Sequence, residues 1–174
     1  MAGLKVEAVM SRTTPRLYYE RLVVPNFEDY LEMPSDIRLG FNTVLPAFQL
    51  SEVMYIFYQD EDASKIAQWP DATDFKKHLT DREPYFLTIQ SLATAYKHLR
   101  LTNALYEVGS PGALWSLTLP RENFDLESSW SDERPRGDVI VQRRDGTRAS
   151  LTAALTAVIE KLWPSVKWSA WGGR

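Results

Sequence analysis

Apolar residues recur at helical spacing between Glu83 and Leu101, and this segment carries the clearest helix signal in the chain. Pro84 occupies a first-turn position, where its missing N–H would be unpaired in any case. One broad apolar face consists of Tyr85, Ile89, Leu92, Ala93, Tyr96 and Leu99. A second stripe on the opposite side mixes apolar and small polar groups: Leu87, Ser91, Thr94, His98 and Leu101. A helix with two faces to bury is typical of the middle of a bundle.

Other segments with helical spacing lie on both sides of this helix. Helices are predicted over 26–31, from 35 or 36 to about 58, over 63–69 and 74–79, and from 150 or 152 to 162. Asn26 caps the first of them and Pro34 ends it. Pro46 predicts a kink in the long second helix, because a proline removes one backbone hydrogen bond. Thr73 caps the helix over 74–79, and Pro164 closes the last one.

Strand signals appear only after the central helix. Residues 104–108 and 114–119 are short strand candidates separated by a Gly/Ser/Pro turn, and in the second Trp115 belongs to the inward-facing set. Residues 120–137 are polar and are predicted to be loop. Asp145-Gly146 between two β-rich runs is a strong hairpin signal. The pattern predicts an α+β fold, mainly α: about four bundled helices, a small antiparallel sheet or hairpin, and a C-terminal helix. More strand than helix in a circular dichroism spectrum would refute it.

The N-terminal segment has a different character. Residues 17–24 are rich in strand formers and stop at Pro25, so they form either an edge strand or a loosely held tail. Residues 1–25 are therefore predicted to be an arm, followed by a single domain over 26–174. The last nine residues are rich in tryptophan, and their rings are expected to cover the sheet or a neighbouring subunit.

Composition narrows the function classes. The chain of 174 residues fits one domain. It has no cysteine, which excludes disulfides and thiolate chemistry and suits a cytoplasmic protein. Two histidines are too few for a histidine-rich zinc centre, and no metal or cofactor motif occurs, so no cofactor is expected. No apolar run is long enough to span a membrane, and no signal peptide is recognisable at the start.

Charge is distributed unevenly along the chain. Residues 1–133 carry 12 Lys/Arg and 20 Asp/Glu, whereas residues 134–174 carry eight and three. The basic C-terminal part has two interpretations, of which one is contact with nucleic acid through Arg143, Arg144 and Arg148. The other is a solvated hairpin whose charges keep the molecule soluble or dock it on a protein partner. The second is favoured, because the basic stretch lacks interleaved aromatic residues and the chain as a whole is acidic.

A candidate polar site combines two predicted helices. Arg38 and Asn42 lie four residues apart on the long helix and share one face. A helix crossing would bring them against the polar stripe of the central helix, which contributes Ser91, Thr94 and His98. Lys97, the neighbour of His98 in the sequence, completes the candidate set. Such a set would bind one anion or polar ligand. It would equally serve as a polar seam that fixes the register of the bundle, and the sequence does not decide between the two.

His98 has a catalytic and a structural interpretation. As a catalytic group it would move a proton while Lys97 or Arg38 holds a phosphate. As a structural group it would be partly buried, with Ser91, Thr94 or Asn42 as hydrogen-bond partners. The apolar neighbours on its stripe favour the structural role. On that interpretation His98→Ala would cost about 1–3 kcal/mol of stability.

Several short motifs together resemble a family of uncharacterised bacterial proteins of about 170 residues. They are Asp29-Tyr30-Leu31, Pro34, Asp36-Ile37-Arg38, Phe41-Asn42, Ala93-x-Ala95-x-Lys97-His98 and the Asp-Gly hairpin followed by a helix. The resemblance covers roughly residues 26–163. It implies a fold but no activity, since the family has none established.

The helical part resembles, more distantly, HEPN domains, which are helical bundles that often dimerise and often cut RNA. Their ribonuclease signature places an Arg four to six residues before a His. In this chain the nearest Arg before His98 is Arg82, and the nearest before His78 is Arg38. The resemblance therefore implies an inactive or regulatory version. The expected function is a non-catalytic interaction or regulatory module, homodimeric or bound to a protein partner. The alternative is an RNA-directed nuclease or toxin that uses His98, Lys97, Arg38 and Asn42.

Overall fold

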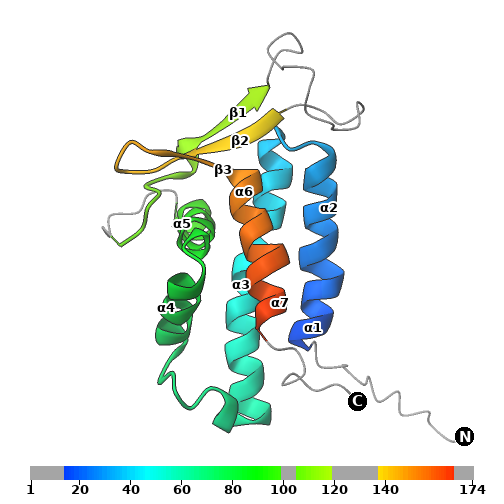
Figure 1. Ribbon diagram of the computed structural model, residues 1–174, viewed down its shortest axis with the longest axis vertical. Coiled ribbons are helices and arrows are strands. Elements are labelled where there is room, and N and C mark those ends of the chain that lie inside the picture. Colours follow the sequence, from blue (N-terminus) through cyan, green and yellow to red (C-terminus); the bar gives the residue numbers. More distant parts are fainter. Residues whose placement is uncertain (1–13, 99–104, 119–136, 167–174) are drawn as a thin grey trace, which may run out of the picture.

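Helices arranged as an elongated bundle make up most of the protein. The computed structural model describes residues 14–98, 105–118 and 137–166. Within these ranges five helical rods pack together, and a three-stranded antiparallel sheet covers one end of the bundle (Figure 1). The predicted α+β, mainly helical class is confirmed. None of the described helices is both long and apolar enough to cross a membrane.

The first rod runs without a break from residue 15 to residue 32. It comprises α1 (Pro15–Tyr18), η1 (Tyr19–Val23) and α2 (Val24–Glu32), with Thr14 as its N-cap. The strand or loose tail expected over 17–24 is therefore wrong, and Val23 is fully buried in the core. Asn26 does not cap a helix, because it lies inside α2. Residues 1–13 of the predicted arm lie outside the described part.

Two π-helical segments let helices continue through prolines. In each, the residue before a proline donates its N–H to the carbonyl five residues back: Val24 to Tyr19, and Trp163 to Val158. Pro25 and Pro164 have no N–H of their own to place in the helix. The wider turn accommodates this loss, as π-bulges commonly do inside α-helices. The strand formers and the proline that suggested a non-helical segment are thus part of one helix.

The long rod α3 (Ile37–Glu61) forms the spine of the bundle. Asp36 caps it as predicted, and its carboxylate accepts hydrogen bonds from the N–H groups of Arg38 (2.8 Å) and Leu39 (3.1 Å). These bonds hold the pKa of Asp36 below its usual value. The buried face consists of Gly40, Thr43, Val44, Ala47, Leu50, Ser51, Met54, Tyr55 and Tyr58. The predicted kink at Pro46 stays a prediction.

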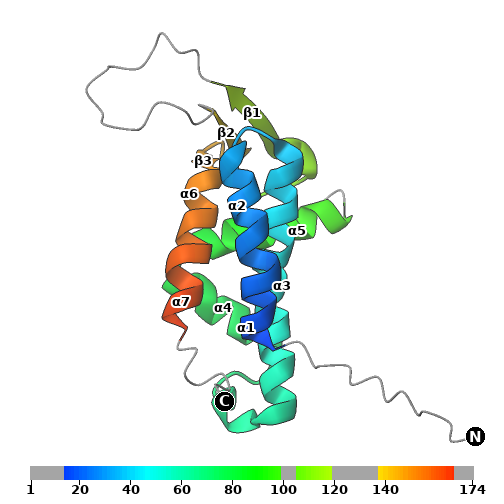
Figure 2. The ribbon, with the colours of Figure 1, turned by 90° about the vertical axis from the view of Figure 1, so that its right-hand side faces the viewer.

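Two shorter helices pack against α3. They are α4 (Ala72–Arg82) and α5 (Tyr85–His98), the second of which confirms the helix predicted over 83–101 as far as it is described. Figure 2 shows that α5 crosses the long axis of the bundle, whereas α2, α3 and α6 run along it. Asp71, not Thr73, caps α4. In the segment predicted to be helical over 63–69, only η2 (Ala63–Lys65) forms a 3-10 turn.

The sheet has the order β1-β2-β3 and contains the predicted hairpin. Its strands are β1 (Leu114–Thr118), β2 (Gly137–Gln142) and β3 (Arg148–Ser150), all antiparallel. Gly146 in the turn has a φ of 85°, which explains why a glycine follows Asp145 there. The inward position expected for Trp115 is wrong, because Trp115 is 41% exposed, whereas the preceding residue Leu114 is buried. No strand forms over the described residues 105–108, and the loop predicted at 120–137 lies almost entirely outside the described part.

The last rod docks against both the sheet and the other helices. It consists of α6 (Leu151–Thr156), η5 (Ala157–Leu162) and α7 (Trp163–Ser165). Ser150 caps it, as expected, by accepting from the N–H of Ala153. Gly40 of α3 allows the close approach to α6, since a Cβ at that position would lie 2.8 Å from the Leu151 side chain. The tryptophan-rich tail lies outside the described residues from 167 onward.

A carboxylate joins the sheet to two helices. Asp138 of β2 accepts hydrogen bonds from the Thr152 N–H (3.2 Å), the Thr152 hydroxyl (2.8 Å) and the Tyr30 hydroxyl (3.3 Å). The Tyr30 side chain is fully buried, and burial raises the pKa of its hydroxyl. Strand β2, helix α2 and the start of α6 are therefore held at one point.

Candidate functional site

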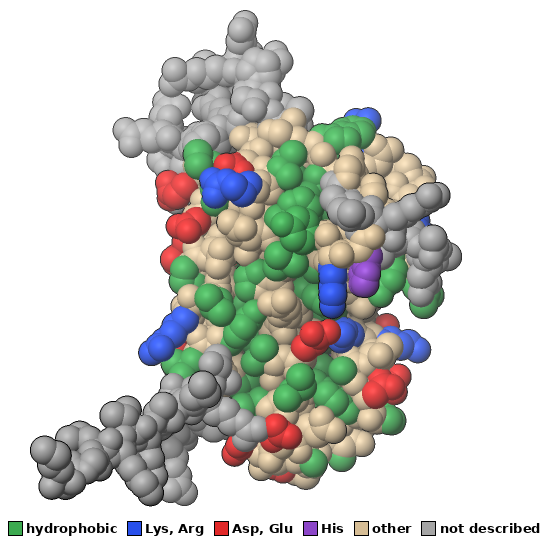
Figure 3. Space-filling view, turned by 180° about the vertical axis from the view of Figure 1, so that it is seen from behind, with side chains coloured by type: hydrophobic (Ala, Val, Ile, Leu, Met, Phe, Trp, Pro, Cys, Tyr) green, Lys and Arg blue, Asp and Glu red, His purple; other side chains and the backbone are tan. Residues whose placement is uncertain are grey.

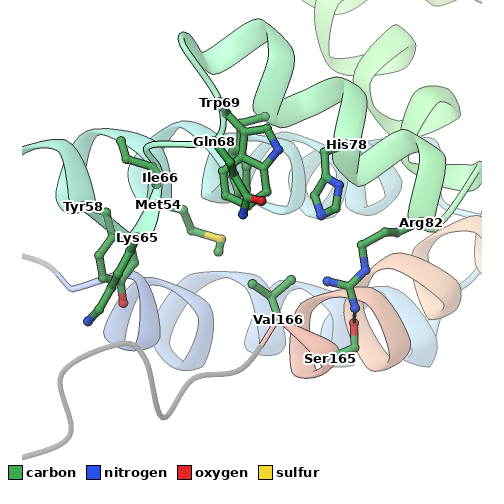
Figure 4. A pocket seen from close by; sticks show the side chains of 11 residues that line it. Met54, Tyr58, Lys65, Ile66, Gln68, Trp69, His78, Arg82, Ser165 and Val166 are labelled. Atoms are coloured by element: carbon green, nitrogen blue, oxygen red, sulfur yellow. Dashed lines mark hydrogen bonds between the residues drawn. The ribbon is translucent and has the colours of Figure 1, made fainter. Parts of the chain in front are cut away.

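A pocket of about 380 Å³ opens at the end of the bundle opposite the sheet, between α3, α4 and the end of the last rod (Figure 4). The residues that line it are Met54, Tyr58, Lys65, Ile66, Gln68, Trp69, Phe75, His78, Arg82, Ser165 and Val166. They come from four parts of the chain: the second half of α3, the connection to α4, α4 itself and the C-terminal end of the last rod. The volume lies within the range of small-molecule sites.

The connection between α3 and α4 is held in place by capping and by one tyrosine. Asp62 ends α3 and accepts a hydrogen bond from the Ser64 hydroxyl, which forms the turn at η2. The Tyr55 hydroxyl of α3 donates to the carbonyls of Trp69 (3.2 Å) and Pro70 (3.1 Å). The chain is thus fixed where the Trp69 ring enters the pocket.

Helix α4 presents an apolar edge and a basic edge to the pocket. Phe75 is buried, and the Trp69 ring lies 4.9 Å from the rings of both Phe75 and His78. His78 and Arg82 are four residues apart, so they stand on the same face of the helix. Figure 4 shows both side chains directed toward the pocket from α4. An indole, an imidazole and a guanidinium therefore follow one another along one wall.

Arg82 connects the two sides of the pocket mouth. One guanidinium nitrogen, Nη2, donates to the Ser165 hydroxyl at 3.0 Å (Figure 4). That hydroxyl in turn donates to the Leu162 carbonyl at 2.7 Å. The proton of Ser165 is therefore directed to a backbone carbonyl, so Ser165 is not prepared to act as a nucleophile.

The opposite wall carries a second cation over an aromatic ring. Lys65 Nζ lies 5.0 Å from the centre of the Tyr58 ring and 3.7 Å from the Asp62 carboxylate. Burial raises the pKa of the Tyr58 hydroxyl, so this group stays neutral even well above neutral pH. The floor between the walls is apolar and is formed by Met54, Ile66, Phe75 and Val166. This arrangement suits a ligand with a flat apolar body.

The polar site predicted from the sequence is located elsewhere. Arg38 is exposed at the start of α3 and pairs with Asp36 at 3.3 Å, and Asn42 is exposed. No hydrogen bond or ion pair among the described residues joins either of them to Lys97 or His98, and none of the four lines the pocket.

Ser91 and Thr94 use their hydroxyl groups within the fold. Ser91 is fully buried and accepts a hydrogen bond from the Glu107 N–H at 3.0 Å. Thr94 donates to the Gln90 carbonyl at 2.7 Å, as a hydroxyl inside a helix often does. Ser91 therefore ties α5 to the segment before the sheet, which is a structural role.

His98 is not buried as the sequence suggested. It is exposed at the last position of α5, next to the exposed Lys97. The cause is that the stripe of α5 that contains His98 is buried at Ser91, is only partly buried at Thr94, and reaches solvent at His98.

Replacing His98 should therefore hardly change stability. We expect His98→Ala to alter the free energy of unfolding by less than about 0.5 kcal/mol, because the side chain is exposed and has no hydrogen-bond partner among the described residues. Urea unfolding of both proteins measures this difference. A loss of about 1–3 kcal/mol would restore the original expectation of a satisfied, structural histidine.

Of the three arginines predicted to contact nucleic acid, Arg143 is partly buried, whereas Arg144 and Arg148 are exposed. Arg143 Nε lies 3.1 Å from a Glu107 carboxylate oxygen, and its Nη2 donates to the buried Thr88 hydroxyl at 3.1 Å. Arg148 covers the Trp115 ring at 4.7 Å. The nucleic-acid contact through Arg143, Arg144 and Arg148 stays a prediction, and Arg143 joins the hairpin to α5 rather than facing outward.

A shallow apolar groove of about 520 Å³ lies between the first rod and α3. It is lined by Tyr18, Leu22, Gln49, Glu52, Val53, Ile56 and Phe57. Leu22 and Ile56 are 45% and 57% exposed. Figure 3 shows apolar side chains along this rear face over α3, with charged side chains on both sides. Among the described residues, the groove is the surface most compatible with the self-association expected from the sequence.

Sequence reasoning missed the pocket residues. The sequence pattern predicts for Trp69 only that it belongs to a short helix over 63–69. His78 stands out only as one of the two histidines of the chain. The four-residue spacing of His78 and Arg82 is visible in the sequence and was a usable signal. The contributions of Met54, Tyr58 and Ser165 were not, because they depend on how distant helices pack.

The comparisons with known proteins add no relative. No family model, curated protein or solved structure matches the chain significantly. The resemblances to a bacterial family and to HEPN domains therefore stay predictions. Within the described residues, no group of three or more His, Asp or Glu side chains is placed to hold a metal ion.

Proposed function

We propose that this protein is a non-catalytic binding module whose aromatic pocket takes up a small organic molecule. The observation that carries the proposal is the pocket itself: a formed cavity with aromatic walls, an apolar floor and a few polar groups at its mouth. Concave, mostly apolar cavities with a small number of polar groups are the usual form of ligand sites.

The side chains at the mouth support binding more than chemistry. His78 is the only imidazole among the lining residues, and its ring lies against Trp69. The Ser165 hydroxyl donates to a carbonyl instead of to a base. A nucleophile paired with a base is the arrangement that covalent catalysis needs. The described lining residues contain no such pair.

A substitution that fills the cavity tests the proposal. Val166 lines the pocket and is only partly buried, so Val166→Trp should fill the cavity without disturbing the core. We expect calorimetric titration with a panel of small aromatic compounds, neutral and charged, to yield binders. A compound present at about 100 times its Kd should raise the free energy of unfolding by about 2.7 kcal/mol.

A matched control separates blocking from the mere addition of an indole. Leu105 is 76% exposed and lies outside the pocket, so Leu105→Trp should retain the binding that Val166→Trp abolishes. Two results contradict the proposal: no compound of the panel binds the unaltered chain, or Val166→Trp binds as well as Leu105→Trp.

The other functional expectations stand beside this proposal as predictions. They are homodimerisation, a protein partner, a cytoplasmic location and the RNA-directed alternative. The groove along α3 supports self-association. For the RNA-directed alternative, no described contact brings His98 or Lys97 to Arg38 or Asn42, so no specific observation favours it over the pocket.

A further inference from the structure

The described side chains that line the pocket include basic groups but no carboxylates. Three basic side chains line it, Lys65, His78 and Arg82, and no aspartate or glutamate is among the described lining residues. Lys65 forms an ion pair with Asp62, at 3.7 Å, and Asp62 is not a lining residue. The net electrostatic character of the cavity is therefore set by cations and by neutral apolar groups.

His78 and Arg82 form a basic pair that the protein itself does not neutralise. Asp74 and Asp81 lie four residues before and three residues after His78 on α4, but neither lines the pocket. No ion pair to either side chain is present among the described residues. A basic pair that faces a cavity without an acid is a feature of sites that receive an anion.

One hydrogen bond orients the guanidinium of Arg82, and most of its N–H donors have no described partner. Ser165 accepts one hydrogen bond from it, at 3.0 Å, and the other donors have no hydrogen-bond partner among the described residues. A guanidinium has five N–H donors in a planar fork that matches a carboxylate. The Ser165 contact thus fixes the direction of the fork, while most of its donors remain available.

The apolar groups determine where the rest of a ligand lies. The Trp69 ring, whose centre lies 4.9 Å from that of the His78 ring, and the floor residues Ile66, Met54 and Val166 are all neutral. They begin next to the basic pair and continue toward Lys65 (Figure 4). A bare inorganic anion would leave this surface uncovered, whereas an anionic group on a flat apolar body would use both parts.

We infer that the ligand of this pocket is an organic carboxylate with a flat apolar body, whose carboxylate is held by Arg82 and His78. This inference rests on the proposed function and specifies the ligand class for the same site. One guanidinium fork and one imidazole match the two oxygens of a carboxylate. A guanidinium fork would also accept a phosphate, so the test below includes one.

Four compounds of the same shape test the inference. The full chain is titrated by calorimetry with naphthalene-1-acetate, its neutral amide, 2-(1-naphthyl)ethylamine and 1-naphthyl phosphate. We expect the carboxylate to bind about tenfold more tightly than the amide, which corresponds to one charge-assisted contact. The amine should bind more weakly than the amide, and the phosphate no more tightly than the carboxylate.

Three variants assign the effect to its residues. Arg82→Gln and His78→Gln remove a basic side chain at similar size, and each should reduce the preference for the carboxylate over the amide. The affinity for the amide should stay within about twofold. Arg21→Gln is the matched control, since Arg21 is exposed on η1 outside the pocket and should leave all affinities unchanged.

The outcomes separate the two proposals. If the amide binds as tightly as the carboxylate, the pocket is a ligand site but the carboxylate assignment is wrong. Tighter binding of the phosphate likewise overturns the assignment, in favour of an organic phosphate. If none of the four compounds binds, and no member of the wider panel does, the proposed function itself fails. A carboxylate preference that survives both Arg82→Gln and His78→Gln would place the anion elsewhere.

Discussion

Trp163→Ala is expected to lower the free energy of unfolding by about 3–5 kcal/mol. Trp163 is the largest of the fully buried side chains, and it meets the Phe86 ring edge-on at 5.8 Å. Phe86 is also fully buried and contacts Phe48 of α3, with ring centres 6.2 Å apart. The indole therefore joins the last rod to α5 and α3, and its removal leaves a cavity where three helices meet. Urea unfolding followed by circular dichroism measures the loss.

Trp163→Phe is the matched control. The indole N–H has no hydrogen-bond partner among the described residues, so a phenyl ring gives up volume but no polar contact. We expect a loss of about 1–2 kcal/mol, clearly smaller than that of the alanine variant. If phenylalanine were as damaging as alanine, the indole N–H would have to be bonded, and the explanation through packing would be wrong.

The second large effect is expected at the carboxylate that joins the sheet to the helices. Asp138→Ala should lower the free energy of unfolding by about 2–4 kcal/mol. It removes the acceptor for the Thr152 N–H, the Thr152 hydroxyl and the buried Tyr30 hydroxyl. Thermal and urea unfolding of the variant test the value.

Two further variants separate the contributions. Asp138→Asn keeps one oxygen acceptor and should cost about 1 kcal/mol, and Tyr30→Phe should cost about the same. In the double variant Asp138→Ala/Tyr30→Phe, the two losses should fall short of adding, because Tyr30 and Asp138 share one contact. Strict additivity would mean that the Tyr30 hydroxyl is satisfied by Thr152 alone, at 3.1 Å.

Local signals predicted those parts of the fold that depend on neighbouring residues. The caps at Asp36 and Ser150 and the turn at Asp145-Gly146 follow from side chains acting on the adjacent backbone, and the structure contains all three. The part of the first rod before residue 26 was missed because its signal is not local in this sense. Its strand formers and Pro25 argue against a helix, and only the π-helical turn before the proline and the burial of Val23 reverse that preference.

The candidate site was predictable only in fragments. The sequence directed attention to His98, because helical spacing cannot show where a stripe leaves the core. The pocket combines residues from α3, from the connection to α4, from α4 and from residues 165–166. A periodic pattern within one segment cannot show that segments so far apart in the sequence pack together. The spacing of His78 and Arg82 was the one available clue, and its meaning depends on the Trp69 ring beside it.

The bond between Arg82 and Ser165 spans 83 positions of the chain, which has a consequence for the order of assembly. During synthesis, α3 and α4 are complete long before the residues that close the pocket leave the ribosome. Contacts of such long sequence separation form late, because closing the intervening loop costs conformational entropy that other contacts must first offset. A ligand of this pocket can therefore recognise the finished chain but not its partly synthesised or partly unfolded forms. Ligand supply would then act on the amount of folded protein as well as on its occupancy.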